Sequence, residues 1–517
     1  MGASGNMIDV AWSMLPEYLG QHVLISAAAI AIGFLVSLPL AVAASRLSWL
    51  RGPALAFASI VQTVPGLALL ALFYPLLLAL SSFTQDAFGF GFRALGFLPT
   101  LLALTLYSML PVLRNTVTAL DEIDPAVRTA ALGVGMTQWQ SLVTVELPLA
   151  APVIMAGLRT AAVWVIGAAT LSTPVGQTSL GNYIFTGLQT ENWVFVLFGC
   201  VAAALLALTA DQLLSLAERG MARRSRPRLL VAAVGLAAIV GASLYVQSDG
   251  AARPAIVGTK SFEEQYILGA LIGERLERAG YRTARRDGLG STVIFHALEA
   301  GDVDVYVDYS GTLWTTAMKR ADMPGRKAVL DRLSSWLAKR GDGYVGALGF
   351  ENAYAFAMRR DRAKALGIET LADLAAHAPQ LKIGGDFEIF SRPEWNGVVK
   401  AYGLRFAVRR QYQANFMYGA VANGDVDVIS AFSSDGRIAQ YDLKILGDPK
   451  HALPPYDAVL LVSPRYAHDE RFLAALRPLV GAIGLAPMQR ANLMVDRDKD
   501  KATAGQAAAM LEAAIPR

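Results

Sequence analysis

Six apolar segments, each about as long as a bilayer-spanning helix, occupy the first half of the chain and constrain its fold more than any other feature. They cover roughly residues 21–45, 53–81, 98–118, 152–171, 193–216 and 229–247. A spanning helix needs about 20 mostly apolar residues. The second segment is interrupted by Gln62-Thr63-Val64-Pro65-Gly66, where we expect a kink or break because Pro removes a backbone donor. The sequence therefore predicts an all-α membrane domain of about six transmembrane helices.

Charged residues are divided unevenly between the two halves of the chain. Residues 1–250 contain 11 Arg, 11 Asp plus Glu and no Lys, and the first Lys is Lys260. Residues 251–517 contain 35 basic and 31 acidic residues, which is ordinary for a soluble domain. The overall 17% of charged residues and mean hydropathy of +0.39 argue against a nucleic-acid binder, a disordered chain or a purely soluble enzyme.

The arginines of the first half predict its orientation. Ten of the 11 lie in loops or helix ends that would share one side of the membrane, five of them in the loop at 219–228, and Arg93 would lie on the other side. The positive-inside rule places those loops in the cytoplasm and both the N-terminus and residues 251–517 outside. The first 20 residues lack a positive n-region, so we do not expect a cleavable signal peptide. We expect a multi-pass protein of the bacterial cell (inner) membrane, with its second half on the periplasmic or extracellular side.

Residues 121–150, between the third and fourth segments, carry the most specific pattern of the first half. Asp124-Pro125 predicts a helix start, with Asp as the N-cap and Pro in the first helical position. The small and apolar residues that follow resemble, in register, the coupling-loop motif of bacterial ABC importer permeases, although Thr129 replaces its Glu and Val145 its Ile. This resemblance implies that the loop docks on a cytoplasmic ATPase subunit, and the alternative is an ordinary amphipathic loop. The matching residues are Ala130, Ala131, Gly135, Leu147 and Pro148.

Residues for ATP hydrolysis and for metal binding are not evident in the sequence. A phosphate-binding loop reads G-x-x-x-x-G-K-[ST], and the nearest string, Gly258-Thr259-Lys260-Ser261, lacks its first Gly. Cys200 is the single cysteine, no His, Asp and Glu cluster has metal-ligand spacing, and no Ser-His-Asp constellation is evident. We therefore expect a non-enzyme with no metal and no cofactor of its own, whose partner ATPase uses ATP and Mg.

From Pro254 onward, short apolar runs alternate with helical patterns, which is typical of an α/β domain. Residues 263–280 predict an amphipathic helix closed by Gly280. The strings at 300–312 and 423–437 both contain Gly-Asp-Val-Asp-Val after a helical run, and their strands end at Tyr309 and Phe432. Unless this echo is chance, it predicts two similar lobes facing one cleft, as in periplasmic binding proteins, with ligand groups at the strand ends.

Five stretches of the second half resemble the substrate-binding domains of osmoprotectant ABC uptake systems, which take up betaine, choline or carnitine. They are 257–269, 309–312, 350–354, 387–394 and 432–437. Nearly the whole chain resembles the fused permease and substrate-binding proteins of that group, and related fused systems take up ergothioneine. The resemblance implies a permease domain over 1–225 with its coupling loop at 121–150, a last transmembrane helix and linker over 226–250, and an extracytoplasmic binding domain over 251–517.

A quaternary ammonium group has no N–H to donate, so a protein must recognise it with aromatic faces, each cation–π contact giving roughly 0.5–2 kcal/mol. Tyr309, Tyr354 and Phe432 lie in motifs that the resemblance associates with such a cage, and Phe390 and Tyr418 are weaker candidates. Phe432 offers a π face without a hydroxyl, which weakens an assignment based on a ring of tyrosines. Donors for a carboxylate or hydroxyl of the ligand are expected in loops, at Gln265, Ser291, Thr292, Thr312 and Asn352. The alternatives are core packing for the aromatics and turn or cap chemistry for the polar residues.

The sequence thus predicts the transmembrane and substrate-binding subunit of an ABC importer for glycine betaine, choline, carnitine or a similar quaternary ammonium osmoprotectant. Ergothioneine import by the same architecture is the alternative within this class. Other classes are a membrane receptor that senses the ligand without moving it and a membrane enzyme with an outer catalytic domain. The expected partners are two cytoplasmic ATPase subunits, a second copy of this chain, the ligand and the lipid bilayer, with no nucleic acid.

Overall fold

The computed structural model describes residues 2–88, 92, 94–190, 192–248, 253–320, 322, 324–414, 416–497 and 500–515. Arg93, which the sequence places on the outer side, lies outside the described residues. The chain forms two compact units. The membrane unit comprises residues 8–185 and 195–251, and the α/β unit comprises residues 1–7, 186–194 and 252–517.

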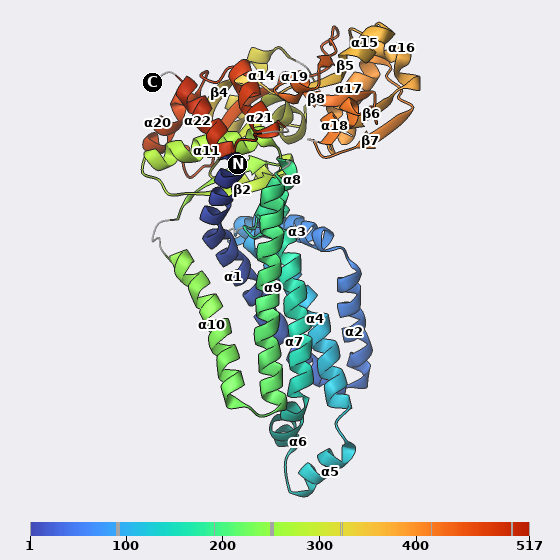
Figure 1. The fold of residues 1–517 in the computed structure, drawn as a ribbon, viewed down its shortest axis with the longest axis vertical. Helices are drawn as coiled ribbons and strands as arrows, with labels where there is room; N and C mark the ends of the chain where they lie inside the picture. Colours follow the sequence, from blue (N-terminus) through green and yellow to red (C-terminus); the bar gives the residue numbers. More distant parts are fainter. Residues whose placement is uncertain are drawn as a thin grey trace. The chain divides into compact units, whose positions relative to one another are not determined.

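Within the described residues, the membrane unit has five helices long and apolar enough to cross a bilayer, and a bent pair makes up to six (Figure 1). The helices of this unit are α1 (Gly2–Arg46), α2 (Ser48–Thr63), α3 (Gly66–Phe88), α4 (Phe97–Asp121), α5 (Pro125–Gly133), α6 (Gln138–Ser141), η1 (Leu142–Glu146), α7 (Leu147–Ala169), η2 (Thr170–Val175), α8 (Gly181–Gln189), α9 (Trp193–Ala222) and α10 (Arg226–Ser248). The first helix begins well before the predicted residue 21. Its early part is held by packing, since Ala11 and Tyr18 are buried against Leu180, Tyr183 and Phe195.

The predicted break in the second segment is confirmed. Helices α2 and α3 meet at an angle of 102°, and Val64 and Pro65 lie between them. The Tyr107 hydroxyl, on α4, donates to the Val64 carbonyl, and the Gln62 amide donates to the Tyr107 carbonyl at 3.4 Å. The first bond gives the Val64 carbonyl a partner at the break, and both bonds fix the bend against α4.

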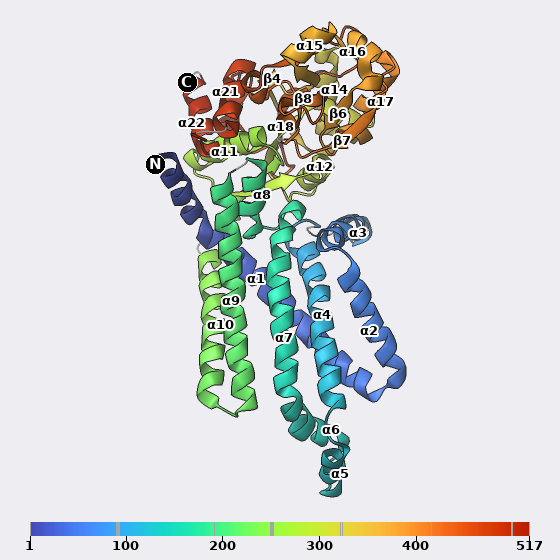
Figure 2. The same ribbon diagram turned by 45° about the vertical axis from the view of Figure 1, so that its right-hand side comes forward.

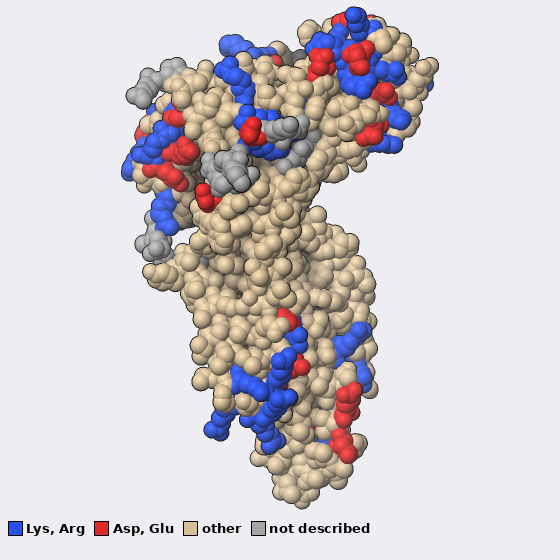
Figure 3. All heavy atoms as spheres, viewed as in Figure 1, with Lys and Arg blue, Asp and Glu red and all other residues tan. Residues whose placement is uncertain are grey.

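Helices α4 and α7 pack closely along their length, as Figure 2 shows. The close approach depends on Gly157, because a Cβ built there would lie 2.8 Å from both Asn115 Cβ and the Pro111 carbonyl oxygen. The end of the unit that holds α5 and α6 is opposite the end that holds α3 (Figure 2). In the view of Figure 3, Arg side chains and a few carboxylates gather in the half of the membrane unit that holds α5 and α6, whereas the half nearer α3 is almost free of charge.

The α/β unit contains two five-stranded sheets of the same design. The first runs in the order β2 (Thr283–Leu289), β1 (Ala255–Lys260), β3 (Val305–Tyr309), β10 (Asp457–Val462) and β4 (Gly343–Glu351). The second runs in the order β7 (Val408–Gln411), β6 (Lys382–Gly385), β8 (Val428–Phe432), β5 (Tyr354–Arg359) and β9 (Leu443–Ile445). In each sheet the first three strands pair in parallel, and the fourth strand pairs antiparallel with both of its neighbours. We call the part built on the first sheet lobe 1 and the part built on the second sheet lobe 2.

The chain passes between the lobes twice, through Asn352-Ala353 after β4 and through residues 446–456 before β10. The two crossings are joined, since the Asn352 N–H donates to the Tyr456 carbonyl at 3.0 Å. The helices of the unit are α11 (Glu263–Arg278), α12 (Ser291–Glu299), α13 (Ser310–Thr312), η3 (Leu313–Ala317), α14 (Arg326–Arg340), α15 (Arg360–Leu366), α16 (Leu371–His377), η4 (Ala378–Gln380), η5 (Ile389–Ser391), α17 (Pro393–Tyr402), α18 (Phe416–Ala422), α19 (Arg437–Gln440), α20 (Glu470–Leu476), η6 (Arg477–Leu479), α21 (Leu485–Asp496) and α22 (Ala504–Ala514).

The two similar strings at 300–312 and 423–437 contain equivalent strands of the two sheets. The repeated strings form β3 and β8, each the third strand of its sheet, and the helices before them are α12 and α18. Both strands are buried almost throughout, as expected for a central strand covered on both faces. Tyr309 and Phe432 therefore stand at corresponding strand ends of the two lobes.

The α4–α7 contact gives a prediction about stability. Replacing Gly157 by Ala should lower the thermal unfolding midpoint of the membrane unit, because overpacking a close contact costs about 1–3 kcal/mol. Gly167→Ala, on the same helix, is the control, since a Cβ there meets no atom within 4 Å. Thermal unfolding of both variants in detergent checks this, and equal midpoints would contradict the close packing.

Candidate functional site

A continuous row of aromatic rings runs through the α/β unit from one lobe to the other. Tyr309 and Phe262 of lobe 1 stack with centroids 6.0 Å apart, and Phe262 is parallel to Phe432 of lobe 2 at 6.1 Å. Phe432 lies 5.2 Å from Tyr354, which contacts Tyr456 of the second crossing edge to face at 5.7 Å. The row brings together the predicted residues Tyr309, Tyr354 and Phe432, and it adds Phe262 and Tyr456.

The Tyr309 hydroxyl is held by a buried network. It donates to Glu264, on α11, and accepts a hydrogen bond from Gln265 Nε2 at 2.9 Å. Glu264 also accepts from the amides of Asn352 and Asn492, at 3.2 and 3.1 Å. Two of the predicted polar residues, Gln265 and Asn352, thus orient Tyr309, directly or through Glu264. Burial raises the pKa of Glu264, and the hydrogen bonds that it accepts offset part of that rise.

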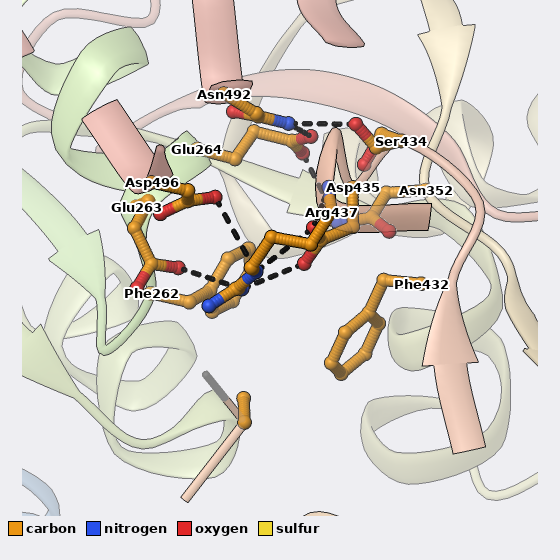
Figure 4. A pocket seen from close by; sticks show the side chains of 11 residues that line it. Phe262, Glu263, Glu264, Asn352, Phe432, Ser434, Asp435, Arg437, Asn492 and Asp496 are labelled. Atoms are coloured by element: carbon orange, nitrogen blue, oxygen red, sulfur yellow. Dashed lines mark hydrogen bonds and ion pairs between the residues drawn. The ribbon is translucent and has the colours of Figure 1, made fainter. Parts of the chain in front are cut away.

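A small pocket opens beside this network (Figure 4). Phe262 and Phe432 face it from the two lobes, and on its far side the buried Arg437 is surrounded by carboxylates (Figure 4). Arg437 pairs with Asp435 at 2.7 Å and lies 3.7 Å from both Glu263 and Asp496. Burial raises the pKa of Asp496, and the Arg437 charge counteracts the rise. The other lining residues are Glu264, Asn352, Ala414, Ser434 and Asn492.

Two cations lie over tyrosine rings of the row. Lys260 Nζ is 5.2 Å from the ring centroid of Tyr309 and forms an ion pair with the buried Asp308. The Arg392 guanidinium lies 5.4 Å from the ring centroid of Tyr354. Both basic residues are buried, so the faces of these two rings already interact with positive charge.

Arg392 also connects the lobes. It stands just before α17 in lobe 2, where it pairs with Glu388 at 2.8 Å and Glu394 at 3.1 Å, and its Nη2 reaches the Thr312 hydroxyl of lobe 1 at 3.4 Å. Glu394 accepts a second interlobe bond from Thr315, at 2.9 Å. Arg392 Nε is buried and has no hydrogen-bond partner among the described residues. A buried guanidinium N–H without a partner is suited to an anionic group.

The remaining predicted residues lie apart from the row. Ser291, at the start of α12, is 3.4 Å from Glu388 of lobe 2, and Thr292 beside it is exposed. Phe390 packs edge to face on Trp395 at 5.0 Å, inside lobe 2. Tyr418 is buried in the second core of that lobe, and its hydroxyl accepts from the Phe432 N–H at 2.9 Å. Tyr418 therefore supports the Phe432 backbone.

The expectation that the polar candidates lie in loops is wrong for four of the five. Gln265, Ser291, Thr292 and Thr312 stand in the first turns of α11, α12 and α13, and Asn352 lies between two strands. At most two residues separate the ends of β1, β2 and β3 from α11, α12 and α13, so these first-turn residues lie close to the strand ends.

Lys260, Phe262, Glu264 and Arg392 were missed, although they lie inside the stretches 257–269 and 387–394. For Lys260, Glu264 and Arg392 the only signal is a charged residue within a stretch that carries the family resemblance, and for Phe262 it is an aromatic ring beside them. Tyr456 carries no local signal, because it reaches the row through the second crossing.

The predicted helix start within residues 121–150 is confirmed. Asp124 caps α5 by accepting from the Ala126 N–H at 2.8 Å, and Pro125 is its first residue. Gly135 has a φ of +88° with open space around it, so it makes the turn out of the helix. Ala131 is buried, Ala130 and Pro148 are exposed, and Leu147 packs beside Leu142. Five large apolar side chains of residues 121–150 are exposed, namely Leu132, Val134, Trp139, Val143 and Leu149.

The buried Glu264 gives a prediction about pH. Because its folded-state pKa is raised, the stability that it contributes is greatest below the ordinary carboxyl pKa and is lost as the pH rises through the raised value. Glu264→Gln should therefore flatten the fall in unfolding midpoint of the α/β unit as the pH rises above the ordinary carboxyl range, about 4. Glu512→Gln is the control, because the pKa of Glu512 is shifted in the opposite direction. Burial alone would raise that pKa, but Arg278 and Arg275 lower it. Calorimetric scans of the full chain measure the unfolding midpoint of both variants as a function of pH. If the midpoint of Glu264→Gln depends on pH as strongly as that of the wild type, the proposed network is contradicted.

Each of the two units matches a known protein family. The family described as the substrate-binding domain of ABC-type glycine betaine transport systems matches residues 254–512. The family described as the inner membrane component of binding-protein-dependent transport systems matches residues 29–223.

Among individual proteins, the ergothioneine transport permease/ergothioneine binding protein EgtU of Helicobacter pylori (strain G27) is 31% identical over 423 residues, covering 78% of this chain and 72% of that protein. The permease protein OpuCB of the glycine betaine/carnitine/choline transport system of Bacillus subtilis (strain 168) is 39% identical over 39% of this chain and 85% of its own length. A crystal structure of a glycine betaine/carnitine/choline ABC transporter matches with 30% identity and a TM-score of 0.43, over 49% of this chain and 96% of that chain. The chain therefore belongs to the family of ABC importer proteins in which a betaine-, choline- and carnitine-type permease is fused to its substrate-binding domain.

Proposed function

We propose that this chain binds a solute carrying a trimethylammonium group between the two lobes of its α/β unit and passes it through its own permease domain. The observation that carries the proposal is the row of five aromatic rings, which spans both lobes and one crossing. A quaternary ammonium group offers no hydrogen to an acceptor, and stacked π faces are the chemistry that recognises it. The fused EgtU and the OpuCB permease belong to systems named for such solutes.

The proposed site uses both lobes, so binding is expected to follow lobe separation and closure. The pocket beside Phe262 and Phe432 measures about 20 Å³, which is room for one water and not for a trimethylammonium ligand. Opening about Asn352-Ala353 and residues 446–456 would separate Phe262 from Phe432 and Thr312 from Arg392. A hinge of this kind couples ligand binding to lobe closure.

Arg392 bears on which solutes fit. We propose that a ligand carboxylate binds its guanidinium beside Tyr354, where the buried Nε supplies a donor, and that Thr312 adds a second. This favours betaines, carnitine and ergothioneine over choline. Ergothioneine is the second candidate ligand, because EgtU shares the fused architecture over most of its length.

The remaining parts of the proposal concern assembly and orientation. An importer permease works with a separate ATPase, and we propose that two ATPase copies dock on the α5–α6 segments of two copies of this chain. The arginines at that end of the membrane unit support a cytoplasmic location for it and an outer location for the α/β unit, in the inner membrane. ATP and Mg would be used by the partner, in keeping with the missing phosphate-binding loop.

The cage is tested by two substitutions. Tyr309→Ala and Tyr354→Ala should each weaken binding at least about tenfold, or about 1.4 kcal/mol, because each removes a π face. Calorimetry of the full chain against glycine betaine, choline, carnitine, proline betaine and ergothioneine measures this and identifies the ligand. Trp336→Ala is the control, since Trp336 stacks on Phe295 and lies under Arg340 in lobe 1, outside the row. Full affinity in both tyrosine variants would contradict the proposed cage.

The role of Arg392 is tested by ligand chemistry. Arg392→Gln should weaken binding of carboxylate-bearing solutes at least about tenfold, because a charge-assisted hydrogen bond is lost, and should change choline affinity by less than about threefold. The same calorimetric series measures both. An equal loss for choline and glycine betaine would show that Arg392 acts through lobe packing and not through the ligand carboxylate.

A further inference from the structure

A buried carboxylate joins the coupling-loop segment to the membrane helices. Glu146 is the last residue of the π-helical turn η1, directly before α7, and its side chain is 2% exposed. It accepts from Arg46 Nη2 at 2.7 and 2.8 Å, from Arg128 Nε at 3.0 Å and from the Ser141 hydroxyl at 3.2 Å. These donors belong to the end of α1, to α5 and to α6. One side chain therefore connects α5 and α6, which lie close to it in the sequence, with the end of α1, which lies 100 positions earlier.

The charges at this junction are unequal. Two arginines share one carboxylate, and Arg128 also donates to the Leu120 carbonyl at the end of α4. A buried carboxylate is stable only when charge partners and hydrogen bonds replace its water, and both Glu146 oxygens are satisfied in this way. Without that carboxylate, Arg46 and Arg128 would be like charges held side by side.

This arrangement bears on the glutamate that the coupling-loop motif lacks. Thr129 stands at that motif position, is exposed, and donates its hydroxyl to the Pro125 carbonyl within its own helix. A hydroxyl used locally carries no charge to another segment. The carboxylate that ties α5 to the rest of the unit comes from Glu146, 17 positions further along the chain.

We propose that Glu146 is a positioning residue for energy coupling: it holds α5 and α6 in a fixed orientation to α1, α4 and α7. Displacement of the coupling loop by the ATPase is then transmitted to the membrane helices. A loop that was free to pivot would absorb the displacement. The proposal rests on the permease family and not on the identity of the ligand.

The first test measures the orientation directly. Spin labels are placed at Trp49→Cys and Val134→Cys, two exposed positions at the start of α2 and the end of α5, in a Cys200→Ser background of the full chain in nanodiscs. In Glu146→Gln the distribution of label distances should become at least about twice as broad, because Gln keeps the shape of Glu but not its charge. An unchanged distribution would overturn the proposal.

Asp121→Asn is the matched control. It breaks the ion pair with Arg51, at 2.7 Å, between α2 and α4 at the same end of the unit, but this pair is largely exposed. An exposed pair contributes little, so the distribution should stay narrow. Glu146→Asp keeps the charge and should give an intermediate width. Equal broadening in Asp121→Asn would overturn the specific role of Glu146.

The second test measures coupling. With the partner ATPase in proteoliposomes, the stimulation of ATP hydrolysis by glycine betaine or ergothioneine, both used as probes, should fall at least about tenfold in Glu146→Gln. The dissociation constant of the same probe should stay within about twofold of wild type. Full stimulation of ATP hydrolysis in Glu146→Gln, together with a broadened distribution of label distances, would also overturn the proposal. Because the distances are measured without ligand or ATPase, an incorrect ligand assignment leaves the first test intact.

Discussion

The constraint on which the proposed site of the α/β unit depends is that a trimethylammonium cation must be recognised without hydrogen bonds to it. Rings from both lobes meet at the strand ends, and buried charges hold them in place. Glu264 orients Tyr309, Tyr418 supports Phe432, and Arg392 lies over Tyr354 while reaching Thr312 across the lobes. The polar network around the rings thus has a structural task, which is to present π faces and close the lobes on them.

Much of this arrangement was predictable from the sequence, because it follows from local pattern. The repeated Gly-Asp-Val-Asp-Val predicted equivalent strands, and β3 and β8 occupy equivalent places in their sheets. The Pro65 break, the Asp124 cap and the close of α11 at Gly280 were also predicted, since each is set by the chemistry of one or two residues. The early start of α1 was not, because it depends on packing of Tyr18 against Tyr183, far along the chain.

The candidate site was predicted less completely, for a physical reason. The resemblance singled out Tyr309, Tyr354 and Phe432, which the structure brings into one row. Phe390 and Tyr418, the weaker candidates, pack inside lobe 2, and only the folded chain shows this. Tyr456 comes from a crossing segment whose path no local pattern reveals. Arg392 and Glu264 are charged groups whose burial depends on both lobes, and the same holds for Glu146, which is buried only because α1 and α5 meet at the start of α7.

The most direct test of the account is transport by the complete system. The chain is reconstituted into proteoliposomes with its ATPase, and accumulation of labelled glycine betaine, choline, carnitine and ergothioneine is followed with and without ATP. The account predicts ATP-dependent accumulation of at least one of these trimethylammonium solutes, suppressed by an excess of the same unlabelled compound. Tight binding of such a solute without any ATP-dependent accumulation would contradict it and would favour a receptor.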